Sequence, residues 1–165
     1  MFKIKLLFIA LLISAVLSAC GLSAPTQQPL PSPKPLPTQQ QISALAGTWM
    51  VSMQLSGGIA GLSQSIDVSS DGAVIAKDER SNKIVKRQLT SAELAQFINL
   101  VKSASLKSSS GGPTDCADCF YYNIQINSND GKFTAQFDDV SLPDSGMSSV
   151  VEYLRDLMSK MLASG

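Results

Sequence analysis

The sequence predicts an α+β domain: an antiparallel sheet in the order β-β-β-β-α-β-β-α, with two amphipathic helices packed on one face. Apolar and polar residues alternate in six short segments, which is the pattern of strands that are buried on one side. Two longer segments repeat apolar residues every three or four positions, as helices with one buried stripe do. Short polar turns separate neighbouring strands, which favours antiparallel pairing.

Four strands are expected before the first helix. The segment 49–55 (WMVSMQL) alternates most clearly, with its odd-numbered residues on one face. The segments 65–69 (SIDVS) and 73–79 (AVIAKDE) follow, joined by a tight hairpin whose Asp-Gly pair supplies the positive backbone φ. The polar turn RSNK then leads into a fourth strand, IVKRQL, at 84–89.

Two helices and a second hairpin complete the pattern. In 89–104 (LTSAELAQFINLVKSA), Thr90 and Glu93 form a capping box at the start of a helix with one apolar stripe. Two further strands lie within 120–138, on either side of the turn SNDG. A closing helix, 146–162 (GMSSVVEYLRDLMSKML), follows shortly after a proline.

The N-terminus resembles a bacterial lipoprotein signal. Residues 1–19 comprise a short basic start, an apolar core and small residues, which is the layout of a secretory signal and too short for a membrane span. The ending LSAC, Leu17 to Cys20, resembles the bacterial lipobox, which implies cleavage before Cys20 and attachment of lipid to its thiol. An ordinary signal with a chance cysteine is the alternative, but it leaves a lone thiol in an oxidising compartment.

Beyond the signal, the chain divides into a tether and a domain. Residues 20–41 hold the lipidated cysteine and a stretch rich in Pro and Gln, which we expect to be extended. Residues 42–165 have the size of one ordinary domain. Acyl chains on Cys20 anchor a protein stably to a membrane, so we expect the domain outside the cytoplasm, in the bacterial cell envelope.

Charge and composition exclude several classes of function. The chain has 13 basic and 13 acidic residues, and loss of Lys3 and Lys5 with the signal changes the net charge from zero to −2. No aromatic residue lies among the basic residues of KIVKR at 83–87, so nucleic acid is not expected as a partner. The chain has no histidine, which removes Ser/His and Cys/His nucleophile pairs and the commonest metal ligand. We expect no enzymatic activity and no cofactor.

Two pairs of acidic residues are candidates for acid–base catalysis, Asp138 with Asp139 and Asp115 with Asp118. Both pairs fall in expected turns, where solvated acids are common. Nothing indicates that two carboxyl groups face a shared cleft, so none of them is assigned a catalytic role.

The motif CADC contains Cys116 and Cys119, which remain as an even pair once Cys20 is lipidated. Its spacing is that of redox proteins, in which a helix starting after the first cysteine lowers the pKa of that thiol, but here a strand follows. A local disulfide that pins the loop to the strand is the favoured interpretation, and a redox role is the alternative. Zinc would need two further ligands, so no metal site is expected.

The glycine-rich stretch SGGIAGL follows the first expected strand. A dinucleotide-binding loop requires a helix after its glycines, whereas here LSQSIDVS alternates like a strand, so we expect a hairpin turn. A turn does not require Ile59 or Leu62. These side chains either fold back under the sheet, which is the favoured interpretation, or stand out as a binding site. The candidate partner-binding residues are Ser56, Gly57, Gly58, Ile59, Ala60, Gly61 and Leu62.

Taken together, these segments resemble the protealysin inhibitor emfourin family, small bacterial proteins that inhibit thermolysin-like zinc metalloproteases. The resemblance rests on SGGIAGLSQSIDV followed by DG, on LTSAELAQFINLV, on FYYNIQI, on a DGK turn and on the closing helix after a proline, within about 51–162. Ile59 stands where the family often has phenylalanine. The resemblance implies a non-catalytic inhibitor whose partner is a secreted zinc metalloprotease. The lipobox and the C-x-x-C pair depart from most members.

Two other functions remain open. The segment AGTW, Ala46 to Trp49, resembles the G-x-W motif of lipocalin-like proteins, which implies a barrel that holds a small apolar ligand. A closed eight-stranded barrel needs more strands than the pattern contains and has no place for a central amphipathic helix. An envelope structural lipoprotein with an unknown partner is the remaining alternative.

Overall fold

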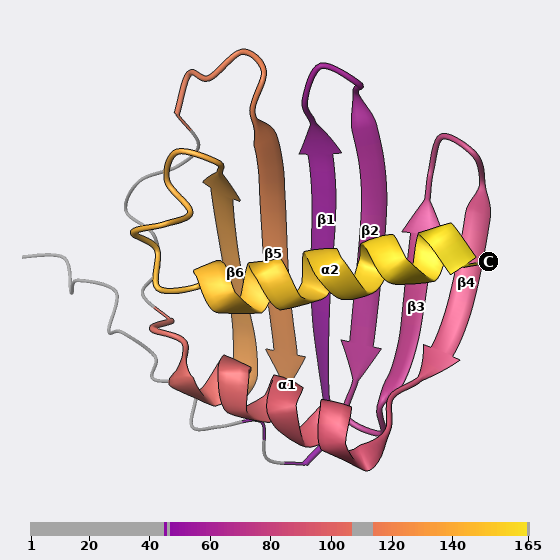
Figure 1. Ribbon diagram of the computed structural model, residues 1–165. Coiled ribbons are helices and arrows are strands. Elements are labelled where there is room, and N and C mark those ends of the chain that lie inside the picture. The colour runs from indigo at the N-terminus through magenta and orange to yellow at the C-terminus, as the bar shows by residue number, and fades with distance from the viewer. Residues whose placement is uncertain (1–44, 46, 107–113, 165) are drawn as a thin grey trace, which may run out of the picture. The chain divides into compact units, whose positions relative to one another are not determined.

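The computed structural model describes residues 45, 47–106 and 114–164 (Figure 1). The expected signal at 1–19, the expected lipidation site Cys20 and the expected tether up to residue 41 lie outside the described residues. Within the described part, neither helix combines the length and the apolarity that crossing a membrane requires.

Six strands of the described residues form one antiparallel sheet, in the spatial order β4-β3-β2-β1-β5-β6 (Figure 1). In the chain, α1 lies between β4 and β5, and α2 follows β6. The expected α+β class, the antiparallel sheet and the two helices are confirmed. The elements are β1 (Trp49–Gly57), β2 (Leu62–Ser69), β3 (Ala73–Asp78), β4 (Lys83–Gln88), α1 (Ser91–Ser103), β5 (Phe120–Ser128), β6 (Gly131–Asp138) and α2 (Ser148–Ser164).

The strand β1 is central because it pairs along its length with both β2 and β5. Its odd-numbered residues from Trp49 to Leu55 are buried on the side of the sheet that carries the helices, as the alternation predicts. β2 begins at Leu62, earlier than the expected Ser65, because its pairing with β1 continues as far as Gly57 opposite Leu62. The glycine-rich turn is therefore shorter than the sequence suggests.

Both helices bury apolar stripes on the same side of the sheet. α2 crosses the strands near their middle, and α1 lies toward the end of the sheet at which β1 begins (Figure 1). Phe97 of α1 is fully buried and joins the layers, since its ring centroid lies 6.1 Å from that of Trp49 in β1 and 5.4 Å from that of Tyr153 in α2. The expected capping box of Thr90 and Glu93 begins α1.

The helices leave two regions of the sheet open. At the end opposite α1, the strands extend past α2, and the loops that precede β2 and β5 lie there (Figure 1). On the far face, away from the helices, polar side chains such as Gln54, Gln125 and Thr134 follow the strands. The loop end of the sheet therefore combines uncovered strand ends with the two motifs that the sequence singles out.

Candidate functional site

The glycine-rich stretch forms the hairpin turn between β1 and β2. Ser56 and Gly57 complete β1, Leu62 opens β2, and residues 58–61 connect them. Gly57, Gly58 and Gly61 have φ values of 95°, 67° and 57°, in the region that side chains disfavour. The N–H of Gly61 donates to the Gly58 carbonyl at 2.9 Å. A strand follows the turn, so the interpretation as a hairpin is confirmed.

The first two glycines also allow another segment to pack directly against the turn. A Cβ on Gly57 would lie 2.6 Å from the carbonyl oxygen of Cys119, and a Cβ on Gly58 would lie 2.4 Å from the ring of Phe120. The N–H of Gly58 donates to that same Cys119 carbonyl at 3.0 Å. At Gly57 both the neighbouring backbone and φ require glycine, whereas at Gly58 φ favours glycine and a side chain would also displace the Phe120 ring.

Ile59 stands at the tip of this turn with 92 % of its surface exposed. The expectation that it folds back under the sheet is wrong, because it lies beyond the last strand pair, Gly57 with Leu62, where neither sheet nor helix reaches it. Leu62 is partly buried and packs against the core. The Arg80 guanidinium donates to the Ala60 carbonyl and supports the turn from the β3–β4 side.

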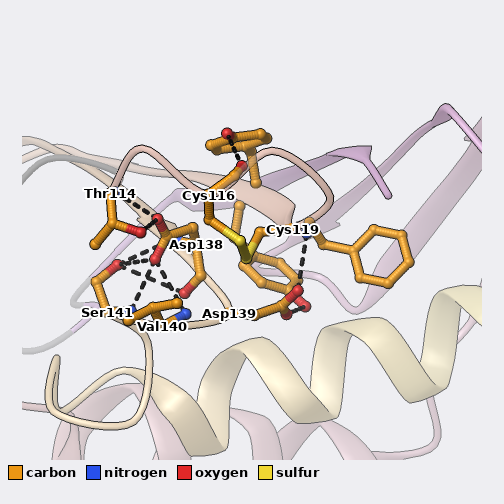
Figure 2. Close-up of a disulfide and its surroundings, with 10 residues drawn as sticks. Thr114, Cys116, Cys119, Asp138, Asp139, Val140 and Ser141 are labelled. Atoms are coloured by element: carbon orange, nitrogen blue, oxygen red, sulfur yellow. Dashed lines mark hydrogen bonds between the residues drawn. A yellow bond between two sulfur atoms is a disulfide. The ribbon is translucent and has the colours of Figure 1, made fainter. Parts of the chain in front are cut away.

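Cys116 and Cys119 form a disulfide beside this turn, with their Cα atoms 5.5 Å apart (Figure 2). The next element in the chain is the strand β5 and not a helix. This is the arrangement expected of a structural disulfide, because a redox pair has a helix after its first cysteine. Cys119 is buried, and the Cys116 carbonyl accepts a hydrogen bond from the Tyr121 hydroxyl at 2.8 Å. The disulfide loop is thus fixed to both β5 and the glycine turn.

Asp138 is a buried carboxylate with five protein donors around it (Figure 2). It accepts from the backbone N–H and the hydroxyl of Thr114, from the N–H groups of Val140 and Ser141 and from the Ser141 hydroxyl. Hydrogen bonding from Thr114 is the main reason that the pKa of Asp138 lies well below its ordinary value of 3.8, and burial opposes this shift. Asp138 therefore holds the loop after β6 to the segment before β5.

Asp139 uses its carboxylate differently. Its two oxygens accept from the backbone N–H of Phe120 and from the Tyr122 hydroxyl, each at 2.8 Å. Both carboxylates of this acidic pair thus accept hydrogen bonds from backbone and side-chain groups of the domain itself. Asp115 and Asp118, the second expected pair, are exposed.

A hollow of about 420 Å³ lies between the loop end of the sheet and α2. Its lining combines apolar and charged side chains: Leu55, Leu62, Gln64, Phe120, Glu152, Arg155, Asp156, Met158 and Ser159. Of these, only Leu62 belongs to the residues that the sequence pattern singles out. Phe120 and Arg155 gave no signal, since a phenylalanine in a strand and an arginine on an amphipathic helix match any ordinary fold.

No protein-family model and no curated protein matches this chain. Among residues 45, 47–106 and 114–164, no three His, Cys, Asp or Glu side chains lie close enough together to hold a metal ion. The residues that the structure brings together are the glycine turn, the disulfide and the hollow.

We predict that replacing both Cys116 and Cys119 by serine lowers the free energy of unfolding by about 2 kcal/mol or less, because the closed loop is short. The larger effect should be local. The Gly58 amide donates to Cys119, so its hydrogen exchange should accelerate, while that of Gly72, which donates to Ser69, should not. Equal protection of Gly58 in both proteins, or two free thiols in the native protein, would contradict this role.

Asp138→Asn should destabilise the domain at neutral pH, because the amide nitrogen cannot accept the hydrogen bonds of the carboxylate. The depressed pKa means that the contribution of Asp138 is complete above the unfolded value of 3.8 and is lost as the pH falls below it. Urea unfolding at neutral and acidic pH should therefore show a smaller acid-induced loss for Asp138→Asn than for the natural protein. The exposed Asp144→Asn should stay within about 0.5 kcal/mol of the natural protein at neutral pH.

Proposed function

We propose that this protein is a membrane-anchored extracytoplasmic lipoprotein whose domain is a non-catalytic binding module that inhibits thermolysin-like metalloproteases. The observation that carries the proposal is the nearly complete exposure of Ile59 at the tip of the glycine turn. A large aliphatic side chain that projects from a turn has no role in the core and is suited to a partner.

The surroundings of the turn favour binding because they fix its backbone in advance. Gly58 is hydrogen-bonded to Cys119, Ala60 to Arg80, and Gly61 to Gly58. A loop held in this way loses little conformational entropy when it enters a cleft. Thermolysin-like clefts favour bulky apolar side chains beside the zinc, and Ile59 meets that requirement.

Membrane anchoring rests on the N-terminal sequence. The LSAC motif that ends at Cys20 provides the lipid attachment site, and two or three acyl chains hold a protein on a membrane where one does not. The protease partner rests on the resemblance to the emfourin family together with the exposed turn. A metalloprotease secreted into or through the envelope is the partner that this arrangement would meet.

The sheet does not favour the lipocalin-like alternative. Its strands form an open series from β4 to β6 in the described residues, and α1 and α2 cover one face. A structural role in the envelope, with another partner, remains the function to test if no protease is inhibited.

Ile59→Asp should weaken inhibition of a thermolysin-like protease by about 30-fold or more, as loss of a hot-spot side chain worth about 2 kcal/mol does. Its stability should change by less than about 0.5 kcal/mol, since the side chain is exposed. Titration of active protease with the protein gives the inhibition constant and the stoichiometry. Ile84→Asp is the matched control, because Ile84 is also exposed but lies in β4.

Equally strong inhibition by Ile59→Asp and by the natural protein would contradict the proposal that the glycine turn contacts the protease. Absence of inhibition across a panel of zinc metalloproteases would overturn the protease partner.

Cys20→Ser should release the protein from membranes and abolish its labelling by a fatty-acid analogue, because the serine hydroxyl does not accept the thioether-linked lipid. Fractionation of cells and in-gel detection of the label measure both effects. Persistent labelling of the variant would contradict lipidation at this residue.

A further inference from the structure

The hollow beside the glycine turn has an apolar floor. By strand register, Leu55, Leu62 and Phe120 lie on the helix-facing side of β1, β2 and β5. α2 crosses these strands near their middle and leaves their ends at this side uncovered (Figure 1). Met158 of α2 adds a fourth apolar side chain to the lining. The volume of about 420 Å³ lies within the range of small-ligand sites, roughly 300 to 1,000 Å³.

The cation of this lining, Arg155, is held by a hydroxyl and has no direct ion pair among the described residues. Arg155 Nη1 donates to the Tyr122 hydroxyl oxygen at 3.0 Å, and that hydroxyl donates to Asp139 at 2.8 Å. Among the described residues, Arg155 forms no salt bridge, a property that it shares with other surface cations such as Lys102. The remaining N–H donors of the guanidinium are available to another acceptor.

Tyr122 is suited to orient this guanidinium without neutralising it. The residue is fully buried in the core of the sheet, which fixes its position. Burial and the hydrogen bond to Asp139 both raise the pKa of the Tyr122 phenol, so it stays neutral at physiological pH. Arg155 is therefore held by a neutral oxygen.

The other charged groups of the lining are Glu152 and Asp156, both on α2. Asp156 pairs with Lys160 at 2.6 Å, so its charge is partly compensated. Glu152 lies one turn before Arg155 on the same helix and is exposed. Gln64 donates weakly to Asp78 at 3.5 Å. Outside the lining, the Asp139 carboxylate lies one hydroxyl away from Arg155, since both contact the Tyr122 hydroxyl. Glu152 and Asp139 are thus the acidic groups that oppose an anion, and water screens them because both residues are exposed.

We propose that this hollow binds a carboxylate that is attached close to a branched or aromatic apolar group. Arg155 pairs with the carboxylate through its free N–H groups, a geometry in which guanidinium excels. Leu62 and Phe120, which are partly exposed, would contact the apolar group, and the buried Leu55 and Met158 lie behind them. Such a ligand is either a small free acid or the C-terminus of a peptide that ends in an apolar residue. The proposal does not require that Ile59 contacts a protease.

The test titrates the full chain in non-ionic detergent with four probes and follows methyl and Arg155 side-chain signals by NMR. N-acetyl-leucine represents the free acid and acetyl-Ala-Ala-Leu the peptide terminus, and the corresponding C-terminal amides are matched controls. At least one acid should bind about tenfold more tightly than its amide, because only the acid offers a charged partner to Arg155. The stronger acid identifies the source.

Variants of Arg155 and Glu152 then test whether these two side chains determine the preference for the acid over the amide. Arg155→Gln should remove the difference between acid and amide, and Glu152→Gln should strengthen binding of the acid by about two- to fivefold through loss of a like charge. Lys102 is an exposed cation on α1, so Lys102→Gln should change neither the affinity for the acid nor that for the amide.

Equal binding of acid and amide, no binding of either acid, or signal changes away from the hollow would overturn the proposal. The comparison of acid with amide uses the natural protein, so it stands even if a variant fails to fold. Inhibition of a protease is not part of the readout, and failure of either proposal leaves the other untouched.

Discussion

The pairing of β1 on both of its edges is the constraint on which the rest of the domain depends. Hydrogen bonds to β2 on one side and to β5 on the other fix which residues of β1 face the helices. The same register places Gly57 opposite both Leu62 and Phe120. The glycine turn, the disulfide loop and the floor of the hollow therefore gather at one end of the sheet, although they come from separate parts of the chain.

Asp138 and Asp139 stabilise that end of the sheet through different hydrogen bonds. Asp138 turns inward and binds Thr114 and Ser141, whereas Asp139 binds the start of β5 and the hydroxyl of Tyr122. Through Tyr122, the second carboxylate also orients Arg155. An exposed acid in a surface loop thus positions a cation on α2, which is a link that only the folded arrangement reveals.

Local patterns predicted the parts of the fold that local physics determines. Alternation marked the strands, and Thr90 with Glu93 marked the start of α1, because both depend on neighbours within a few residues. The position of β5 beside β1 was not predicted, since pairing between distant segments leaves no local trace. For Ile59 the sequence favours burial because the side chain is large and aliphatic, but its place beyond the last strand pair leaves it exposed. Arg155 could not be identified from the sequence, because Tyr122 and Phe120 lie beside it only in the folded domain.

The central position of β1 has a kinetic consequence. Its partner β2 follows it directly, so this hairpin closes with little loss of chain entropy, but β5 arrives only after β3, β4 and α1. Until then, one edge of the innermost strand keeps its backbone donors and acceptors unpaired. The pairing of β1 with β5 therefore joins the last two strands to the first four, and the incomplete chain is sensitive to aggregation for as long as Phe120–Ser128 has yet to dock.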